Sequence, residues 1–246
     1  MKKILTALFI IVSCLTCCAS VFAERAPLES VYGLPKDNVD YALDPNIDYL
    51  IVGYHQAIPK EHIRAAEARM VFQPNDVDRD MIGIENATFA AYMLLKSRLK
   101  ADYGIEIGLY DAYRTPKDQQ WLIDSGVATF RTGEVGFSEH HTGLLLDVVV
   151  SFTVFDQYAG EYRDYYYSEA AVRTFDDLPL EVTLEPFQVL DSLLADYGFI
   201  ERFPEGKEGI TGVPYTPGEI RFVGSPEVAH AIMDNELTLE EYVAGR

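Results

Sequence analysis

Hydrophobic positions along the chain follow a helical period in some segments and a strand period in others. Between residues 84 and 103 apolar side chains such as Met93 and Leu99 recur at helical spacing, which predicts an amphipathic helix, and Gly104 is placed to end it. Residues 105–110 then alternate as expected for a half-buried strand. A helix followed directly by a strand is therefore the first structural unit that the pattern predicts.

Capping signals and apolar runs predict the other elements. A second helix should begin after Thr115, because its hydroxyl can cap the helix, Pro116 suits the first helical position and Asp118 completes a capping box. The remaining expected elements are strands over 49–54, 142–152 and 220–223, and helices over 185–197, 226–235 and 238–243. Strands followed at intervals by helices, with few hairpin signals, indicate a small α+β domain.

The first 23 residues show the pattern of an export signal. Two lysines precede an apolar run that extends to about residue 19, and the letters VFA at 21–23 supply the small-residue pattern that a signal peptidase recognises. The run is short and interrupted by polar residues, which disfavours stable membrane insertion. We therefore expect a periplasmic or extracellular protein; a lipoprotein anchored through Cys14, in the lipobox-like letters IVSC, is the alternative.

The rest of the chain divides into an extension and one domain. Residues 24–47 are polar and contain three prolines that break any periodicity, which is typical of an extension. Residues 48–246 have the length of a single domain. All three cysteines lie within the export signal, so the mature domain should depend on its hydrophobic core and not on disulfides.

The net charge of the mature chain limits the classes of partner that it can bind. Without the two signal lysines it has 18 basic and 39 acidic residues, a formal charge of −21. Such a surface repels nucleic acid and anionic membranes, and we exclude both as principal partners.

The letters SEHHTGLLLDV at residues 138–148 carry the clearest chemical signal, because His140 and Asp147 begin an apolar run at a spacing typical of metal sites. Together with YRT at 113–115, and with the C-terminal stretch YGFIERFPEGKEGITGVPYTPGEIRFVG, this block resembles the VanY-like D-alanyl-D-alanine carboxypeptidases. The resemblance extends from about residue 49 to the C-terminus. It implies a small LAS-type metallopeptidase fold, with a central and mostly antiparallel sheet flanked by helices, and action on peptidoglycan peptides that end in D-Ala-D-Ala.

The resemblance also implies roles for particular residues. In that family a zinc ion is held by His, Asp and His, while a Glu acts as general base. The first two ligands fall on His140 and Asp147. The groups that hold the substrate carboxylate or oxyanion fall on Arg114, Gln119 and Ser138.

The C-terminal half of the implied site departs from the family pattern. The family's Glu-Pro-Trp-His falls on TPGE, so Thr216 stands at the general-base position and Glu219 at the third metal-ligand position. A hydroxyl does not accept a proton at neutral pH, and a second anionic ligand should weaken the effect of zinc on its bound water. Glu139 and Glu219 are the carboxylates near these motif positions that we nominate as substitute bases. Zinc is therefore expected to bind weakly or not at all.

Two functions follow from this departure. The chain is either an exported metallo-carboxypeptidase with an unusual site or a catalytically silent relative that binds wall peptide or a protein partner. Residues 156–177 add a tyrosine-rich segment, which is either a packed surface excursion or an aromatic platform for glycan or peptide.

Overall fold

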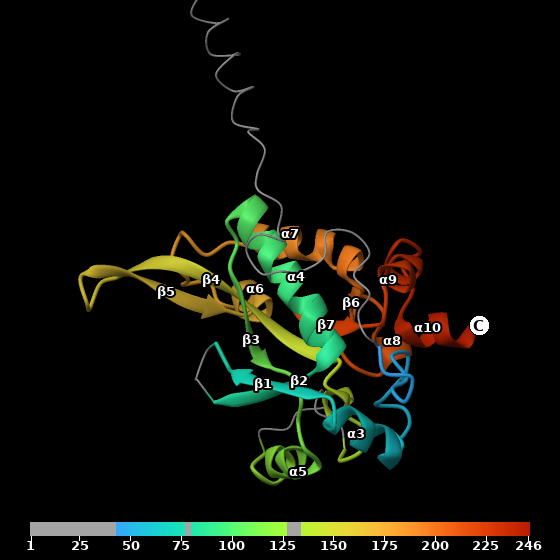
Figure 1. Ribbon diagram of the computed structural model, residues 1–246. Coiled ribbons are helices and arrows are strands. Elements are labelled where there is room, and N and C mark those ends of the chain that lie inside the picture. Colours follow the sequence, from blue (N-terminus) through green and yellow to red (C-terminus); the bar gives the residue numbers. More distant parts are fainter. Residues whose placement is uncertain (1–42, 77–79, 127–133) are drawn as a thin grey trace, which may run out of the picture. The chain divides into compact units, whose positions relative to one another are not determined.

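A five-stranded antiparallel sheet forms the centre of the fold (Figure 1). The computed structural model describes residues 43–76, 80–126 and 134–246. The sheet has the order β3-β4-β7-β6, with β5 paired to the outer part of β4. Its strands are β3 (Ile107–Asp111), β4 (Leu145–Asp156), β5 (Glu161–Tyr167), β6 (Phe199–Glu201) and β7 (Glu219–Phe222). A separate antiparallel hairpin consists of β1 (Met70–Pro74) and β2 (Met81–Glu85).

Helices and short 3-10 turns accompany the sheet, so the expected α+β class is confirmed. The α-helices are α3 (Lys60–Glu67), α4 (Asn86–Tyr103), α5 (Pro116–Asp124), α6 (Glu169–Thr174), α7 (Glu185–Leu193), α8 (Glu208–Thr211), α9 (Pro226–Met233) and α10 (Leu239–Ala244). The 3-10 turns are η1 (Glu139–Thr142) and η2 (Ala195–Tyr197).

The two helices that apolar periodicity and capping residues predict most clearly are both formed. Helix α4 starts after Glu85, whose carboxylate accepts a hydrogen bond from the Thr88 amide, and ends at Gly104, which adopts the left-handed conformation (φ 71°). Tyr92, Leu95 and Leu99 on this helix are fully buried. Helix α5 has the reciprocal capping box between Thr115 and Asp118. The expected strand over 142–152 is displaced, because η1 occupies its start.

The strand expected over residues 49–54 is not formed; that prediction is wrong. The segment is buried at Ile51 and Val52, yet it pairs with loops and side chains and not with a strand. The Tyr54 amide donates to the Phe137 carbonyl at 2.8 Å, and the Arg221 guanidinium donates to the Ile51 carbonyl at 3.1 Å. An apolar run bounded by polar residues predicted burial correctly but not the backbone partner.

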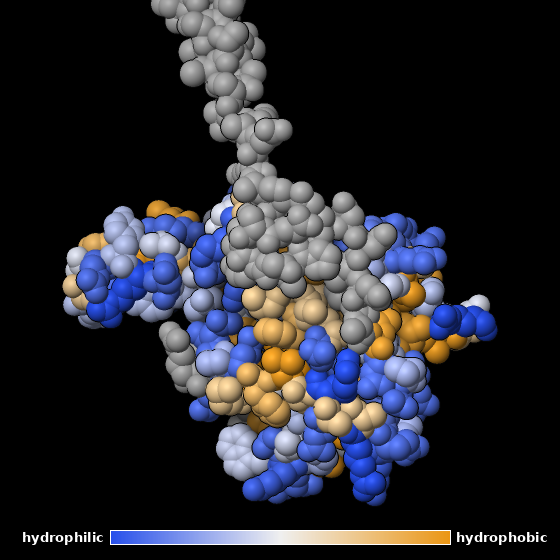
Figure 2. All heavy atoms as spheres, viewed as in Figure 1, coloured by the Kyte–Doolittle hydropathy of each residue, from blue (hydrophilic) through white to orange (hydrophobic). Residues whose placement is uncertain are grey.

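The tyrosine-rich segment lies largely on an arm, formed by the outer halves of β4 and β5, that projects beyond the rest of the sheet (Figure 1). Tyr158 at its tip is 94% exposed, and Phe155 packs edge-to-face on Tyr162 with ring centroids 5.3 Å apart. Figure 2 shows that this arm is mainly hydrophilic, whereas apolar side chains gather near the centre of the same face. The arm is therefore largely exposed, and within it Phe155 and Tyr162 pack on each other.

The expected export signal and residues 24–42 of the expected extension lie outside the described residues. The end of the extension packs onto the domain, because Ile47 is only 5% exposed. Among the described helices, none combines the length and apolar character needed to cross a bilayer.

Candidate metal and peptide site

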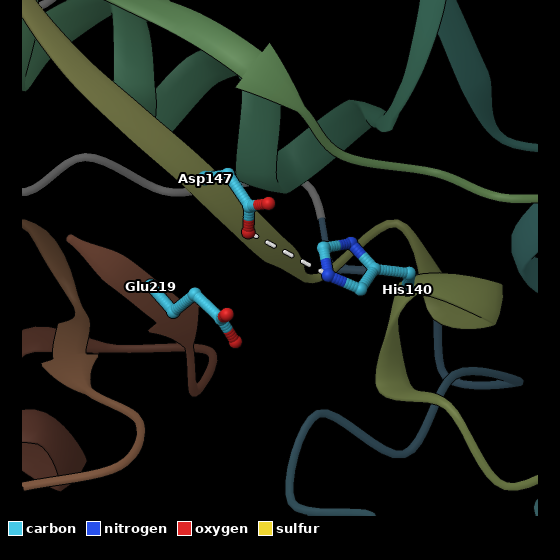
Figure 3. Close-up of side chains that lie close together, drawn as sticks. All are labelled: His140, Asp147 and Glu219. Atoms are coloured by element: carbon cyan, nitrogen blue, oxygen red, sulfur yellow. Dashed lines mark ion pairs between the residues drawn. The ribbon is translucent and has the colours of Figure 1, made fainter. Parts of the chain in front are cut away.

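Three side chains from separate elements converge at one end of the central sheet (Figure 3). His140 comes from η1, Asp147 from β4 and Glu219 from β7, and Asp147 lies directly opposite Glu219 in the antiparallel pairing of the two strands. One ligand atom from each residue lies within 4.8 Å of the other two. The fold thus brings together the three residues that the sequence assigned to a metal.

His140 is held in the form that binds metals. Its ring is buried, and Nδ1 lies 2.6 Å from the Ala112 carbonyl, so Nδ1 carries the proton. Nε2 is then a lone-pair donor, and it lies 3.5 Å from Oδ1 of Asp147. Burial, and then the charge of Arg114, lower the pKa of His140 well below its usual range. The imidazole is therefore neutral, with its ligand nitrogen turned toward the two carboxylates.

The charges around Asp147 and Glu219 favour a bound cation. Two carboxylates directly opposite each other in a sheet repel. The Arg114 guanidinium lies 3.8 Å from Asp147, but its Nε is already bound to Asp111 at 2.5 Å. Tetrahedral zinc, with ligand bonds of about 2.1 Å, places neighbouring ligand atoms about 3.4 Å apart. The separation between His140 and Asp147 fits that geometry.

His141 and Glu139, on either side of His140, are committed to structural contacts. His141 uses both ring nitrogens, one with the Arg114 carbonyl at 2.8 Å and the other with the Gly136 amide at 3.1 Å. Glu139 is completely buried and receives two hydrogen bonds of 2.8 Å from Arg202, as well as one of 3.1 Å from Arg221.

These contacts decide the basicity of Glu139. Burial alone raises its pKa, but the Arg202 and Arg221 guanidinium groups outweigh that effect and lower the pKa to about 2. A carboxylate with so low a pKa and with both oxygens bound is a poor proton acceptor. The structure therefore argues against Glu139 as a substitute base and leaves Glu219 as the remaining candidate.

Of the residues expected to hold substrate, Arg114 and Ser138 lie beside the metal candidates. The Arg114 amide donates to the His140 carbonyl at 3.1 Å, which ties Arg114 to η1. Gln119 is the one buried residue of α5. Nη1 of Arg114 and the Ser138 hydroxyl are buried without a hydrogen-bond partner among the described residues. Buried donors of this kind are what an incoming carboxylate requires.

The turn before β7 carries Thr216 and Gly218, which stand where the family pattern has Glu and Trp. The Thr216 hydroxyl is buried and donates to the Pro214 carbonyl at 2.8 Å. Gly218 has a left-handed backbone (φ 86°), and a side chain there would approach the Val148 carbonyl to 3.2 Å. A cavity of about 150 Å³ adjoins this turn and is lined by Asp147, Glu219 and Thr216, among others. The turn therefore faces open space next to the candidate metal site.

Two features of this region were not found from the sequence. No sequence pattern marks Tyr54, whose hydroxyl is buried and whose pKa is raised by that burial and by the charge of Glu219. The second feature is a group of acids. Burial raises the pKa of Asp191 to about 7 and that of Glu201 to about 8, and the charge of Glu169 raises both pKa values further. These acids come from separate elements, so only the folded chain brings them together.

Comparison with known proteins identifies the lineage. The family model for VanY, D-alanyl-D-alanine carboxypeptidase, matches residues 83–225. The bifunctional D-Ala-D-Ala dipeptidase and carboxypeptidase VanXYC of Enterococcus gallinarum is 36% identical over 155 residues, which are 59% of this chain and 71% of that protein. The D-alanyl-D-alanine carboxypeptidase of Enterococcus faecium is 34% identical over 126 residues, or 51% of this chain and 33% of that protein.

Solved structures agree with the fold. A zinc complex of the vancomycin resistance D,D-pentapeptidase VanY aligns with a TM-score of 0.53 at 24% identity, covering 79% of this chain and 98% of that one. The LD-carboxypeptidase LdcB aligns with a TM-score of 0.57 at 24% identity, covering 78% and 84%. The expected LAS-type metallopeptidase fold is thereby confirmed. The chain belongs to the VanY family of D-alanyl-D-alanine carboxypeptidases.

Proposed function

We propose that this protein is an exported metallo-carboxypeptidase that acts on the D-Ala-D-Ala end of peptidoglycan peptides, with His140, Asp147 and Glu219 as its metal ligands. One observation carries the proposal: a buried, neutral histidine presents its free nitrogen to two carboxylates on paired strands. The substrate class is that of the VanXYC relative, a D-Ala-D-Ala dipeptidase and carboxypeptidase. Zinc is the metal present in the aligned VanY structure.

The chain's own residues supply the binding groups. Asp111 orients the Arg114 guanidinium through its Nε, which leaves Nη1 available for the peptide carboxylate. Ser138, two residues before His140, and Gln119 on α5 are both buried, and we assign them to the same carboxylate-binding group. Zinc, when bound, polarises the scissile carbonyl and lowers the pKa of its water.

Proton transfer is the weak part of this site. Thr216 occupies the position of the general base, and its hydroxyl donates to a backbone carbonyl instead of accepting a proton. Glu219 is the carboxylate left for this task, and it cannot serve fully as both ligand and base. Loss of general-base help typically costs ~10²- to 10⁴-fold in rate. We therefore propose a slow enzyme whose metal affinity is below that of a His/Asp/His site.

A silent binding protein is the second candidate, and the engaged Thr216 hydroxyl is the observation that favours it. In that case Arg114 and Ser138 still hold the peptide carboxylate, but no water is activated. Export is common to both proposals and rests on the pattern of residues 1–23. Intact-mass analysis of the exported protein should show a chain that begins at Glu24; a lipid on Cys14 would replace that interpretation with the lipoprotein one.

Release of D-alanine from a D-Ala-D-Ala peptide, measured with and without added zinc, tests the proposal. We expect slow, zinc-dependent release that His140→Ala abolishes. His230→Ala is the matched control, because His230 is a partly exposed histidine on α9 that is paired with Asp196 and does not belong to the candidate metal group. Peptide binding without release supports the silent protein. If zinc-treated protein neither binds the peptide nor releases D-alanine, both candidates are contradicted.

A further inference from the structure

Arg202, directly after β6, contacts both segments that carry the outer metal candidates. Its side chain is fully buried, and its guanidinium donates one hydrogen bond to each carboxylate oxygen of Glu139, both at 2.8 Å. Glu139 immediately precedes His140 in η1. The Arg202 amide donates to the Glu219 carbonyl at 3.0 Å. One residue therefore links the histidine on η1 to the carboxylate residue on β7.

Further buried contacts fix Glu139 and the residues before it. The Arg221 guanidinium, on β7, donates to the Glu139 carboxylate at 3.1 Å, and the Gly53 amide donates to the same carboxylate at 2.8 Å. Tyr54 has a left-handed backbone (φ 57°), which is strained for a bulky residue, and its amide donates to the Phe137 carbonyl at 2.8 Å. The position of η1 is thus set by contacts with β7 and with residues 53–54, in addition to that with Arg202.

The C-terminal helix α10 completes the contacts of Arg202. Glu240 on this helix accepts hydrogen bonds from Nη2 and Nη1 of Arg202 at 2.7 and 3.1 Å. A guanidinium is planar and its N–H donors have fixed directions, so two carboxylates on its edges determine how it lies. With Glu139 and Arg221, these groups form a cluster of two guanidinium groups and two carboxylates whose charges balance. Removal of Glu240 leaves a surplus positive charge in this buried cluster.

Two adjacent glutamates of α10 have different partners. The helix lies beside α8, and its first residue, Leu239, is fully buried (Figure 1). Glu241 pairs with Lys207 at 3.0 Å, and its carboxylate also completes the capping box of α10. Glu240 instead binds Arg202. Glu241 therefore stabilises the helix and its docking, whereas Glu240 connects the helix to the contacts that fix η1.

We propose that Arg202 is a positioning residue of the metal site and that Glu240, on the C-terminal helix, holds Arg202 in the required orientation. Docking of α10 is thereby coupled to metal binding. While Glu240 binds Arg202, η1 and β7 present His140 and Glu219 at a fixed separation; without Glu240 that separation is less tightly fixed. The inference rests on the proposed function, because it takes His140 and Glu219 as metal ligands.

Zinc titration of metal-free protein by calorimetry tests the inference with three variants. Arg202→Lys keeps the charge but cannot bind two carboxylates through a planar group, and we expect about tenfold weaker zinc binding. Glu240→Ala removes the link to α10 and should weaken zinc binding about fivefold. Glu241→Ala is the matched control. It removes an ion pair and a cap from the same helix, and it should leave the zinc affinity unchanged.

Two further measurements distinguish positioning from a general loss of stability. Because Glu240 acts through Arg202, Glu240→Ala should weaken zinc binding little further when it is added to Arg202→Lys. The visible absorption of bound Co²⁺ reports the geometry of its ligands. It should change in Glu240→Ala but not in Glu241→Ala, although we expect both variants to lower the melting temperature of the metal-free protein.

The other outcomes have distinct meanings. An unchanged zinc affinity and Co²⁺ spectrum in Glu240→Ala overturn the inference and leave the proposed function standing. An equal loss of zinc affinity in Glu241→Ala also overturns it, because the loss then follows from the stability of α10 and not from Arg202. If Arg202→Lys does not fold, the comparison of Glu240→Ala with Glu241→Ala still decides. If the unmodified protein binds neither zinc nor Co²⁺, the proposed function itself fails, and the inference fails with it.

Discussion

Consecutive residues of one short turn belong to two buried polar clusters that differ in how their charges are satisfied. In the first cluster Glu139 is bound by Arg202 and Arg221, and Arg202 also binds Glu240. In the second, His140 faces Asp147 and Glu219 on paired strands. Both clusters are largely removed from water, but the carboxylate of the first receives hydrogen bonds from two guanidinium groups, whereas in the second the Arg114 guanidinium lies 3.8 Å from Asp147.

The difference separates structural polar groups from functional ones. A buried ion pair with good geometry and complete hydrogen bonding fixes a local structure and needs no ligand. A site with a donor that has no partner among the described residues, such as Nη1 of Arg114, and with two opposed carboxylates has groups suited to an anionic substrate and to a cation. The first cluster therefore holds η1 in place, and η1 in turn positions His140 in the second cluster.

Breaking the first cluster should have the largest effect. Glu139→Gln leaves Arg202 and Arg221 buried without their shared counter-ion, and removing one partner of a buried pair typically costs 3–5 kcal/mol. We expect a loss of that size in urea unfolding. Glu240→Gln is the control, since this carboxylate is more exposed and contacts only Arg202 of the two, and it should cost much less. A loss below about 1 kcal/mol for Glu139→Gln would show that the first cluster does not stabilise the fold.

Repairing the second cluster should have the next largest effect. Glu219→His restores a neutral third ligand and Thr216→Glu restores a carboxylate at the base position, with room in the adjacent cavity of about 150 Å³. Because ligand and base act as a unit, the double variant should release D-alanine ~10²-fold faster than either single variant. Gly218 should be kept, since its positive φ strains any larger residue. Hydrolysis by unmodified protein at the rate of the double variant would contradict the slow-enzyme account.

Sequence reasoning predicted some parts of this molecule and missed others for identifiable reasons. Capping signals located α5, and the histidine and aspartate that the SEHHTGLLLDV block predicts as ligands lie together in the structure. Short segments such as β1 and the projecting β5 were missed, because their burial alternates weakly. Tyr54 was missed because its backbone strain arises from contacts with residues 137–139, which are distant in sequence.

A smaller effect should appear in the pH dependence of stability. The pKa of Glu201 is raised to about 8 in the folded chain, mainly by burial, so the folded state holds a proton that the unfolded state has released. Stability therefore falls as pH rises from the unfolded pKa of 4.5 toward about 8. Glu201→Gln should raise the melting temperature by a few degrees near pH 9 and change it little near pH 4. Exposed Glu205→Gln is the control; equal shifts at both pH values would refute the linkage.

Zinc titration of metal-free protein tests the contrast between the two clusters most directly. Calorimetry should give one zinc ion per chain for the unmodified protein, no binding for His140→Ala, and at least tenfold weaker binding for Glu219→Gln, which preserves the shape of the side chain but removes its charge. Glu219→His should bind more tightly than the unmodified protein. Absence of zinc binding in the unmodified protein, or an affinity unchanged in Glu219→Gln, would contradict the assignment of His140, Asp147 and Glu219 as one metal site.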